Sequence, residues 1–279
     1  MTDLKWHMTG AALTALLLGC GDSTAPGDPG GGGNPNPPPP PVLLQDVVLS
    51  NLPSPYYHFE YDSADRIRAV SFASGFTMYE VVYQGDRISE LRNNALGNTD
   101  RLVYQYDGAG RVSEVSYVRP DNTVSTRVML TYDGEKLTGL ERERQMADSF
   151  VVDKTVSFSY YPDGNLQELT EHRPLIEGFQ PATTTVDRFE QYDAGINVDG
   201  FGLIHDDFFD HLVLLPGVVL QKANPARVTR TGDGDNFTVD YVYTYDARNR
   251  PLIASGDLLL LNGTDAGRHI QIQSGFTYY

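Results

Sequence analysis

The segment LVYQYDGAGRV, residues Leu102–Val112, decides the fold of this chain. Leu102, Tyr104 and Tyr106 are spaced two residues apart, so they lie on one face of a strand, whereas Gln105 lies on the other face. The Asp-Gly pair that follows supplies residues that favour a tight turn. The segment therefore predicts a half-buried antiparallel strand that ends in a hairpin turn, with one wet face.

The same pattern recurs along the chain. Each copy is an alternating strand that ends in Tyr, then a polar turn, then a basic or polar residue followed by an aliphatic one. The copies are Tyr57–Ile67, Tyr79–Ile88, Leu102–Val112, Val128–Leu137, Val156–Leu166 and Tyr241–Leu252, with a degenerate copy at Phe189–Gly195. The spacing of the early copies fits one hairpin plus a connection. We therefore expect an all-β fold, an antiparallel meander of repeated hairpins.

The tyrosine that ends each copy is expected to belong to the core, together with the apolar residues two and four positions before it. This spacing places all three side chains on one face of the strand. The repeat-core tyrosines are Tyr61, Tyr83, Tyr106, Tyr132, Tyr160 and Tyr245, and Tyr192 ends the degenerate copy. Stacking of sugars on these rings is the alternative interpretation; core packing is favoured because the pattern assigns the rings to the buried face.

The returning strands carry aliphatic residues three positions apart, as at Val112 and Val115. On a flat strand such residues point to opposite faces. A β-bulge just after the turn would return both to one face and bend the sheet. A sheet with this many strands curls rather than staying open, and closure removes its exposed edges. We expect a barrel-like sheet whose polar face argues against an apolar, lipid-facing band.

A late insertion interrupts the repeat before its final copy. Asp206–Leu215, DDFFDHLVLL, has helix-like apolar spacing, and Pro216-Gly217 would end the helix. We expect one short helix that plugs or caps one end of the sheet. Asp207 and His211 would then lie one turn apart on one helix face, which makes them weak candidates for a metal site. A solvated helix face explains the same residues, and no metal or cofactor is predicted.

The first residues predict a lipoprotein signal peptide. Lys5 precedes the apolar run Ala11–Leu18, which is too short to span a bilayer. The run ends in Leu17-Leu18-Gly19-Cys20, which resembles the bacterial lipobox. The resemblance implies that residues 1–19 are removed and that Cys20 is acylated, so that its acyl chains make the membrane the first partner of the protein. The alternative is a buried N-terminal helix with an incidental cysteine.

Residues 20–42 are expected to be an acylated cysteine followed by a disordered tether. The Gly/Pro/Asn composition of this tract cannot bury enough apolar surface to order it. Its Pro-rich half is expected to be semi-extended, at roughly 3.1 Å per residue. Residues 43–279 form the repeat domain. Cys20 is the only cysteine, so neither a disulfide nor thiol chemistry is predicted.

Two resemblances follow from these motifs. Tyr106–Val112 matches the Tyr-Asp-x-x-Gly-Arg-aliphatic pattern and resembles the YD repeats of RHS-type shell proteins, although this chain is far too short to enclose a toxin. The lipobox, linker and degenerate copies together are similar to a group of uncharacterised bacterial lipoproteins with a porin-like β-barrel domain. This second resemblance spans most of residues 45–279. With Gly21, typical of sorted lipoproteins, it implies an outer-membrane lipoprotein that faces the periplasm or the cell surface.

The composition limits the function. A net charge of −16 disfavours nucleic acid as a partner, and the chain has no nucleophile elbow, P-loop, dinucleotide fingerprint or paired-histidine zinc motif. No catalytic residue is predicted. The leading hypothesis is a non-enzymatic, lipid-anchored binding or scaffolding module whose partner is an envelope protein or glycan. The alternatives are an envelope polysaccharide hydrolase that uses carboxylates in the barrel mouth, and a purely structural surface protein.

Overall fold

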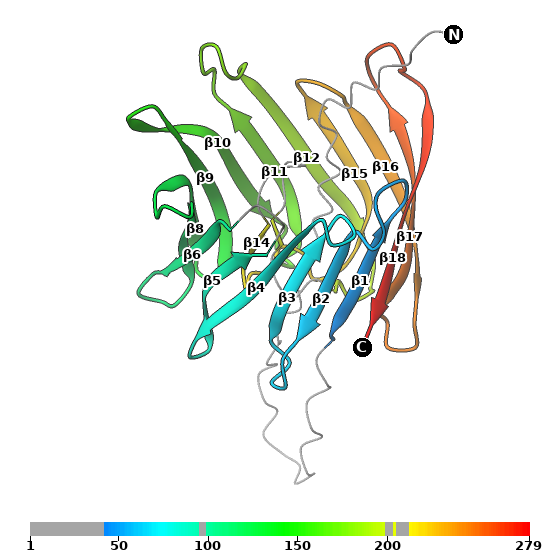
Figure 1. Cartoon of the computed structure of the whole chain (residues 1–279). Coiled ribbons are helices and arrows are strands. Elements are labelled where there is room, and N and C mark those ends of the chain that lie inside the picture. Colours follow the sequence, from blue (N-terminus) through cyan, green and yellow to red (C-terminus); the bar gives the residue numbers. More distant parts are fainter. Residues whose placement is uncertain (1–41, 95–98, 199–202, 205–211) are drawn as a thin grey trace, which may run out of the picture.

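The computed structural model describes residues 42–94, 99–198, 203–204 and 212–279, and in this part of the chain 16 antiparallel strands close into a barrel (Figure 1). Strands follow one another around the barrel as they do along the sequence, and β18 pairs with β1 to close it. The first half consists of β1 (Leu44–Leu49), β2 (Tyr57–Tyr61), β3 (Ile67–Phe72), β4 (Thr77–Gln84), β5 (Arg87–Asn93), β6 (Arg101–Tyr106), β7 (Val112–Val118) and β8 (Val124–Asp133). The second half consists of β9 (Lys136–Met146), β10 (Ser149–Tyr160), β11 (Leu166–Arg173), β12 (Thr183–Tyr192), β15 (Pro225–Gly232), β16 (Phe237–Tyr245), β17 (Pro251–Leu260) and β18 (His269–Tyr278). The prediction of an all-β meander curled into a barrel is confirmed.

Each hairpin of the repeat carries the expected β-bulge. In the β6–β7 hairpin Tyr106 pairs with Val112, but the residue before it pairs with Glu114, so Ser113 is the extra residue. The bulge returns Val112 and Val115 to one face, and both are buried. The same shift occurs where Tyr61, Tyr83, Tyr132, Tyr160 and Tyr245 end their strands.

The apolar face of the sheet points into the lumen. Side chains such as Leu91, Leu102 and Leu137 are completely buried, and in a closed barrel only the inner face can exclude water in this way. The outer face carries ion pairs between neighbouring strands. Examples are Arg68–Glu60 (2.7 Å), Arg101–Glu90 (3.3 Å), Arg188–Glu168 (3.1 Å) and Arg227–Asp240 (2.6 Å). This is the reverse of a lipid-embedded barrel, whose outer band is apolar.

The late insertion contributes to the core of the barrel. Leu212–Leu215 and Leu220 are fully or almost fully buried and belong to the main apolar cluster of the barrel. The backbone N–H of Leu214 donates a hydrogen bond of 3.1 Å to the hydroxyl of Tyr104 on β6. The insertion therefore enters the lumen and packs against the inner wall.

The short helix predicted over Asp206–Leu215 is not supported. Residues 206–211 lie outside the described part of the chain, and the rest contains β14 (Val213–Leu214), which pairs with β13 (Leu203–Ile204). A short apolar run surrounded by core on all sides has no amphipathic face, so its period cannot distinguish a buried strand from a helix. None of the described residues belongs to a helix that is long and apolar enough to cross a membrane.

The two ends of the barrel differ. The turns of the repeat lie at one end, which we call the repeat rim, and the connections such as 147–148 and 261–268 lie at the other, the far rim (Figure 1). The chain enters β1 at the repeat rim, where the N–H of Tyr279 donates to the carbonyl of Leu43 at 3.1 Å. The described part of the chain therefore begins at the repeat rim.

Candidate functional site

The repeat-core tyrosines form a belt inside the repeat rim. Five of them are partly buried against the main apolar core. The sixth, Tyr245, lies against Gly195 of the insertion. Five of the hydroxyls donate to a backbone carbonyl on the preceding strand: Tyr61 to Leu44 (2.8 Å), Tyr83 to Ile67 (2.9 Å), Tyr106 to Ile88 (2.8 Å), Tyr132 to Val112 (2.8 Å) and Tyr160 to Leu137 (2.6 Å). Burial raises the pKa of Tyr83 and of Tyr132 to about 12. These rings serve the architecture.

The recurring spacing of the repeat motif has a local explanation in the turn at Asp107. Its carboxylate accepts from the N–H of Ala109 and of Arg111, both at 2.9 Å, and from Nε of Arg111 at 2.8 Å. Arg111 then lies 4.7 Å above the ring of Tyr132 in the next hairpin. Gly110 has φ +84, and a Cβ there would lie 2.6 Å from the Arg87 guanidinium. The motif thus joins each hairpin to the next.

The other residues singled out in the sequence lie outside the described ranges. Cys20, Asp207 and His211 belong to segments whose placement the structure does not describe, so acylation and the weak metal candidate stay predictions. Within the described ranges, no group of three or more His, Cys, Asp or Glu side chains is placed to hold a metal ion.

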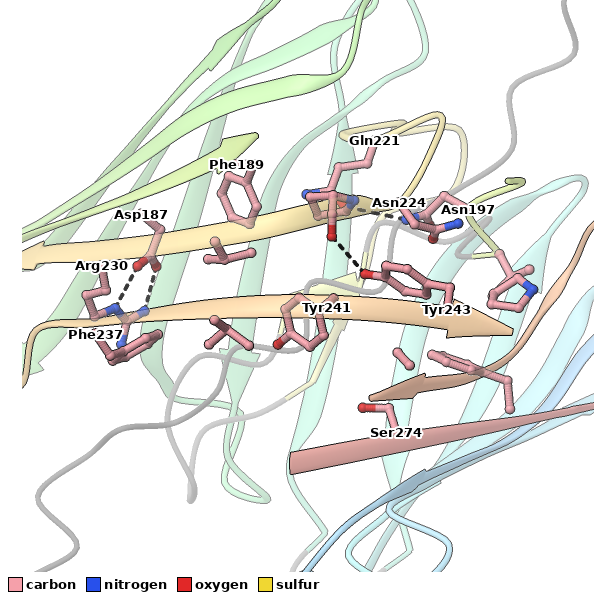
Figure 2. A pocket seen from close by; sticks show the side chains of 17 residues that line it. Asp187, Phe189, Asn197, Gln221, Asn224, Arg230, Phe237, Tyr241, Tyr243 and Ser274 are labelled. Atoms are coloured by element: carbon pink, nitrogen blue, oxygen red, sulfur yellow. Dashed lines mark hydrogen bonds and ion pairs between the residues drawn. The ribbon is translucent and has the colours of Figure 1, made fainter. Parts of the chain in front are cut away.

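A cavity of about 120 Å³ lies in the lumen between the insertion and the strands β12 and β15–β18 (Figure 2). Its apolar wall consists of Phe189, Val228, Phe237, Val239 and Phe276. Asn197, Gln221 and Asn224 of the insertion face this wall across the cavity. The cavity is therefore apolar on the barrel side and lined with amides on the insertion side.

A buried ion pair closes one end of the cavity. Arg230 on β15 donates from Nε and Nη2 to the two carboxylate oxygens of Asp187 on β12, at 2.7 and 2.5 Å. The two residues are cross-strand partners, and the guanidinium lies 5.3 Å from the centre of the Phe237 ring. Such a bidentate pair is rigid. It fixes the polar end of the cavity, and Arg230 occupies both oxygens of the Asp187 carboxylate.

Gln221 presents a donor that the described part of the chain does not satisfy. The residue is 2% exposed, and its Nε2 has no hydrogen-bond partner among the described residues. Its Oε1 accepts a long bond of 3.4 Å from Nδ2 of Asn197. A buried polar group left without a partner costs about 1–3 kcal/mol. Such a group in a cavity wall is therefore a candidate for contact with a bound molecule.

The side-chain amide of neighbouring Asn224, in the same wall, has hydrogen-bond partners for its Nδ2. Its Nδ2 donates to the carbonyl of Ile196 at 3.2 Å and to the hydroxyl of Tyr245 at 3.1 Å. That hydroxyl in turn donates to the carboxylate of Asp193. Burial, followed by the hydrogen bond to Asp193, raises the pKa of Tyr245. This network anchors the insertion to β16 and places Gln221 at the cavity.

Aromatic rings form the floor of the cavity along β16. The rings of Tyr241 and Tyr243 lie 6.0 Å apart, and the hydroxyl of Tyr243 donates to the carbonyl of Pro225 at 3.0 Å. Burial raises the pKa of Tyr241 to about 12, so its hydroxyl stays protonated at neutral pH. Gly256 lies opposite Tyr241, and a Cβ on it would lie 2.9 Å from that ring. The small residue lets the ring lie flat against the wall.

Sequence reasoning did not identify this cavity. Asp187, Gln221, Arg230 and Tyr241 come from separate segments, and only closure of the barrel brings them together. The sequence feature that could have indicated it is the polar Gln221 directly after the apolar run Val218–Leu220. A polar side chain at the end of a buried run needs a hydrogen-bond partner.

No protein-family model and no curated protein sequence matches the chain. Solved structures of two porin-like proteins are similar to it in fold. One, from Bacteroides uniformis, is 12% identical with a TM-score of 0.56, and the match covers 85% of this chain and 95% of the other. The second, from Bacteroides vulgatus, is 15% identical with a TM-score of 0.53, over 85% and 99% of the two chains. The chain therefore has a porin-like β-barrel fold.

Proposed function

We propose that this protein is a lipid-anchored, non-enzymatic protein of the bacterial cell envelope that binds a small amphipathic molecule in the lumen of its barrel. The observation that carries the proposal is the buried Nε2 of Gln221, a residue that lines the cavity, which has no hydrogen-bond partner in the described part of the chain. A bound acceptor atom would satisfy this donor, and the aromatic wall would take the apolar part of the molecule.

The dimensions of the cavity favour a small, flat ligand. An apolar cavity of roughly 150 Å³ in another protein holds one benzene ring, so a volume of about 120 Å³ limits the enclosed part of a ligand to about one small ring. The ring would pack between Tyr241 and the apolar wall, and the substituent would accept from Gln221. The size is below the roughly 300 Å³ at which drug-sized pockets begin.

The contents and the surface of the barrel favour binding over conduction. A pore needs an open, polar lumen and an apolar outer band, whereas this lumen holds the apolar cluster and the insertion, and the outer face carries ion pairs. The apolar lumen and the charged outer face therefore support a barrel that stands outside the bilayer, although its fold is porin-like. Acylation at Cys20 would hold it there, with the repeat rim toward the membrane and the far rim away from it.

The hydrolase alternative finds no support in the cavity. Glycoside hydrolysis uses two carboxyl groups on either side of the scissile bond. Among the described residues that line the cavity, Asp187 is the only carboxylate, and Arg230 occupies both of its oxygens. A purely structural role remains the competing hypothesis, and a failure of the cavity to bind any probe would favour it.

Benzamide tests the proposal, because it combines one ring with a carbonyl acceptor. We expect the full-length protein in detergent to bind benzamide saturably in ligand-observed NMR, and to bind toluene, which has no acceptor, more weakly. Ala254 lines the cavity and is buried, so Ala254→Phe should block benzamide. Thr244→Val, an exposed position on β16, is the matched control. Equal binding by Ala254→Phe and the wild type would contradict the proposal.

A further inference from the structure

The hydroxyl of Tyr241 differs from those of the two tyrosines that follow it on the inner face of β16. The hydroxyl of Tyr243 donates to the carbonyl of Pro225 at 3.0 Å, and that of Tyr245 donates to the carboxylate of Asp193. Tyr241 lines the cavity and is partly buried, yet its hydroxyl has no hydrogen-bond partner among the described residues. It is therefore a second polar group of the cavity wall that a bound molecule could satisfy.

The surroundings of the Tyr241 ring hold it in place. The ring lies 6.0 Å from that of Tyr243, along the same wall (Figure 2). On its other side lies Gly256 of β17, where a Cβ would be 2.9 Å from the ring and 2.8 Å from the side chain of Ile272. Burial raises the pKa of Tyr241 to about 12, so the hydroxyl keeps its proton at neutral pH. The cavity thus has a positioned donor on its barrel side.

The charges in the cavity wall cancel. Asp187 and Arg230 are the only charged side chains among the described residues that line the cavity, and they form the bidentate pair at 2.7 and 2.5 Å. A ligand carboxylate would therefore find no cation of its own here. Burying an unpaired charge costs far more than burying a neutral acceptor that gains a hydrogen bond. The cavity favours an uncharged ligand.

We propose that the cavity takes an uncharged aromatic ring with two hydrogen-bond acceptors, one for Nε2 of Gln221 and one for the hydroxyl of Tyr241. The inference rests on the proposed binding function and names the class of ligand more closely. Gln221 belongs to the insertion and Tyr241 to β16, so the two donors act from different walls of the cavity. A ring with a single acceptor leaves one of them unsatisfied, whereas a ring with two can satisfy both. Tyr241 is then a specificity-determining residue.

Pyridinecarboxamides test the second contact, because each replaces one ring C–H of benzamide by a nitrogen acceptor and keeps the shape. In ligand-observed NMR with the full-length protein in detergent, we expect nicotinamide or isonicotinamide to bind about three- to ten-fold more tightly than benzamide. A ring nitrogen that met no donor would weaken binding instead, since it would lose its water. Benzamide that binds at least as tightly as both pyridinecarboxamides would overturn the proposal.

Benzoate tests the requirement for an uncharged ligand. It has the ring of benzamide with a carboxylate in place of the amide, and we expect it to bind at least roughly ten-fold more weakly at neutral pH. Benzoate that binds as tightly as benzamide would contradict this part of the proposal.

Tyr241→Phe keeps the ring and removes the donor. In this variant the affinities of benzamide and of the preferred pyridinecarboxamide should come to within about two-fold of each other. Tyr132→Phe removes a tyrosine hydroxyl in the repeat rim, where it donates to Val112, and should keep the wild-type preference. A preference that survives Tyr241→Phe would overturn the role of Tyr241. If Ser274→Ala then abolished it, the second contact would belong to the hydroxyl of Ser274, which also lines the cavity.

Failure of the proposed function and failure of this inference give different results. If neither benzamide nor a pyridinecarboxamide binds, the lumen is not a binding site of this kind and both fail. If benzamide binds and neither pyridinecarboxamide binds more tightly, the lumen still holds a ligand and only the contact with Tyr241 is refuted.

Discussion

The hydroxyl of Tyr106 donates a 2.8 Å hydrogen bond to the backbone carbonyl of Ile88, the first aliphatic residue of β5, the returning strand of the preceding hairpin. The same relationship joins Tyr83 to Ile67 and Tyr132 to Val112. Each tyrosine thus ties its own hairpin to the one before it. The tyrosine that recurs in the sequence therefore forms a series of hydrogen bonds that connect neighbouring hairpins around the repeat rim.

Removing one hydroxyl from this belt should weaken the barrel modestly. In Tyr132→Phe the ring stays beneath Arg111, so the change isolates the hydrogen bond to Val112. We expect the free energy of unfolding in urea to fall by about 1 kcal/mol. Thr244→Val on the exposed face of β16 is the control. A Tyr132→Phe barrel as stable as the wild type would show that the hydroxyl belt does not stabilise the fold.

The turn carboxylates should make part of the stability depend on acid pH. Backbone and side-chain hydrogen bonds from Arg111 hold the pKa of Asp107 below its ordinary value. A lowered folded-state pKa contributes stability that is fully present above the unfolded pKa of about 3.9, and that is lost as the pH falls through the folded value. We therefore expect Asp107→Asn to be less stable than the wild type at neutral pH, with the difference shrinking below about pH 4.

Urea midpoints measured from neutral to acid pH check this expectation. Asp235→Asn, at an exposed position in the far-rim turn between β15 and β16, is the control. The account of the turn is wrong if the gap between Asp107→Asn and the wild type stays constant or widens on acidification.

Much of the barrel follows from local sequence, and the reasons are physical. The two-residue spacing at Leu102, Tyr104 and Tyr106 defines a buried strand face regardless of context. The three-residue spacing at Val112 and Val115 is compatible with one buried face only through a bulge, and the bulge is present. Both signals act within one hairpin, which is why they can be read without the fold.

The insertion and the cavity could not be predicted in this way. Leu212–Leu215 is buried by strands that are remote in sequence, so its apolar run carries no period that separates helix from strand. Gln221 and Tyr241 meet because the barrel closes around the insertion. The bulge at Asp153 lies in the middle of β10, where no turn residue or spacing in the sequence indicates it.

The orientation of the barrel at the membrane is testable with single cysteines. Cys20 is the only cysteine and would be consumed by acylation, so an introduced cysteine would be the only free thiol. A fluorophore at Arg248→Cys, in a repeat-rim turn, should transfer energy to a lipid dye more efficiently than one at Asp265→Cys on the far rim (Figure 1). Cys20→Ala should abolish both signals by releasing the protein. Equal transfer from the two positions would contradict a fixed orientation.

Replacing Gln221 with an apolar residue should raise the stability of the protein and weaken its preference for a ligand with an acceptor. In Gln221→Leu a buried donor without a described partner is replaced by an apolar side chain, so we expect the ligand-free protein to gain about 1 kcal/mol in unfolding free energy. The same variant should lose preference for benzamide over toluene. Asn224→Leu is the matched comparison, because its bonds to Ile196 and Tyr245 would be broken and the protein destabilised. A destabilised Gln221→Leu would mean that Gln221 serves the fold instead.

The most direct test of a ligand-binding lumen is a crystal structure of the protein soaked with benzamide, in which the distance from Nε2 of Gln221 to the nearest benzamide atom is measured. The account predicts a benzamide ring beside Tyr241, with its carbonyl oxygen within about 3.2 Å of Nε2. Density for water alone in the cavity, or benzamide bound only outside the lumen, would contradict it.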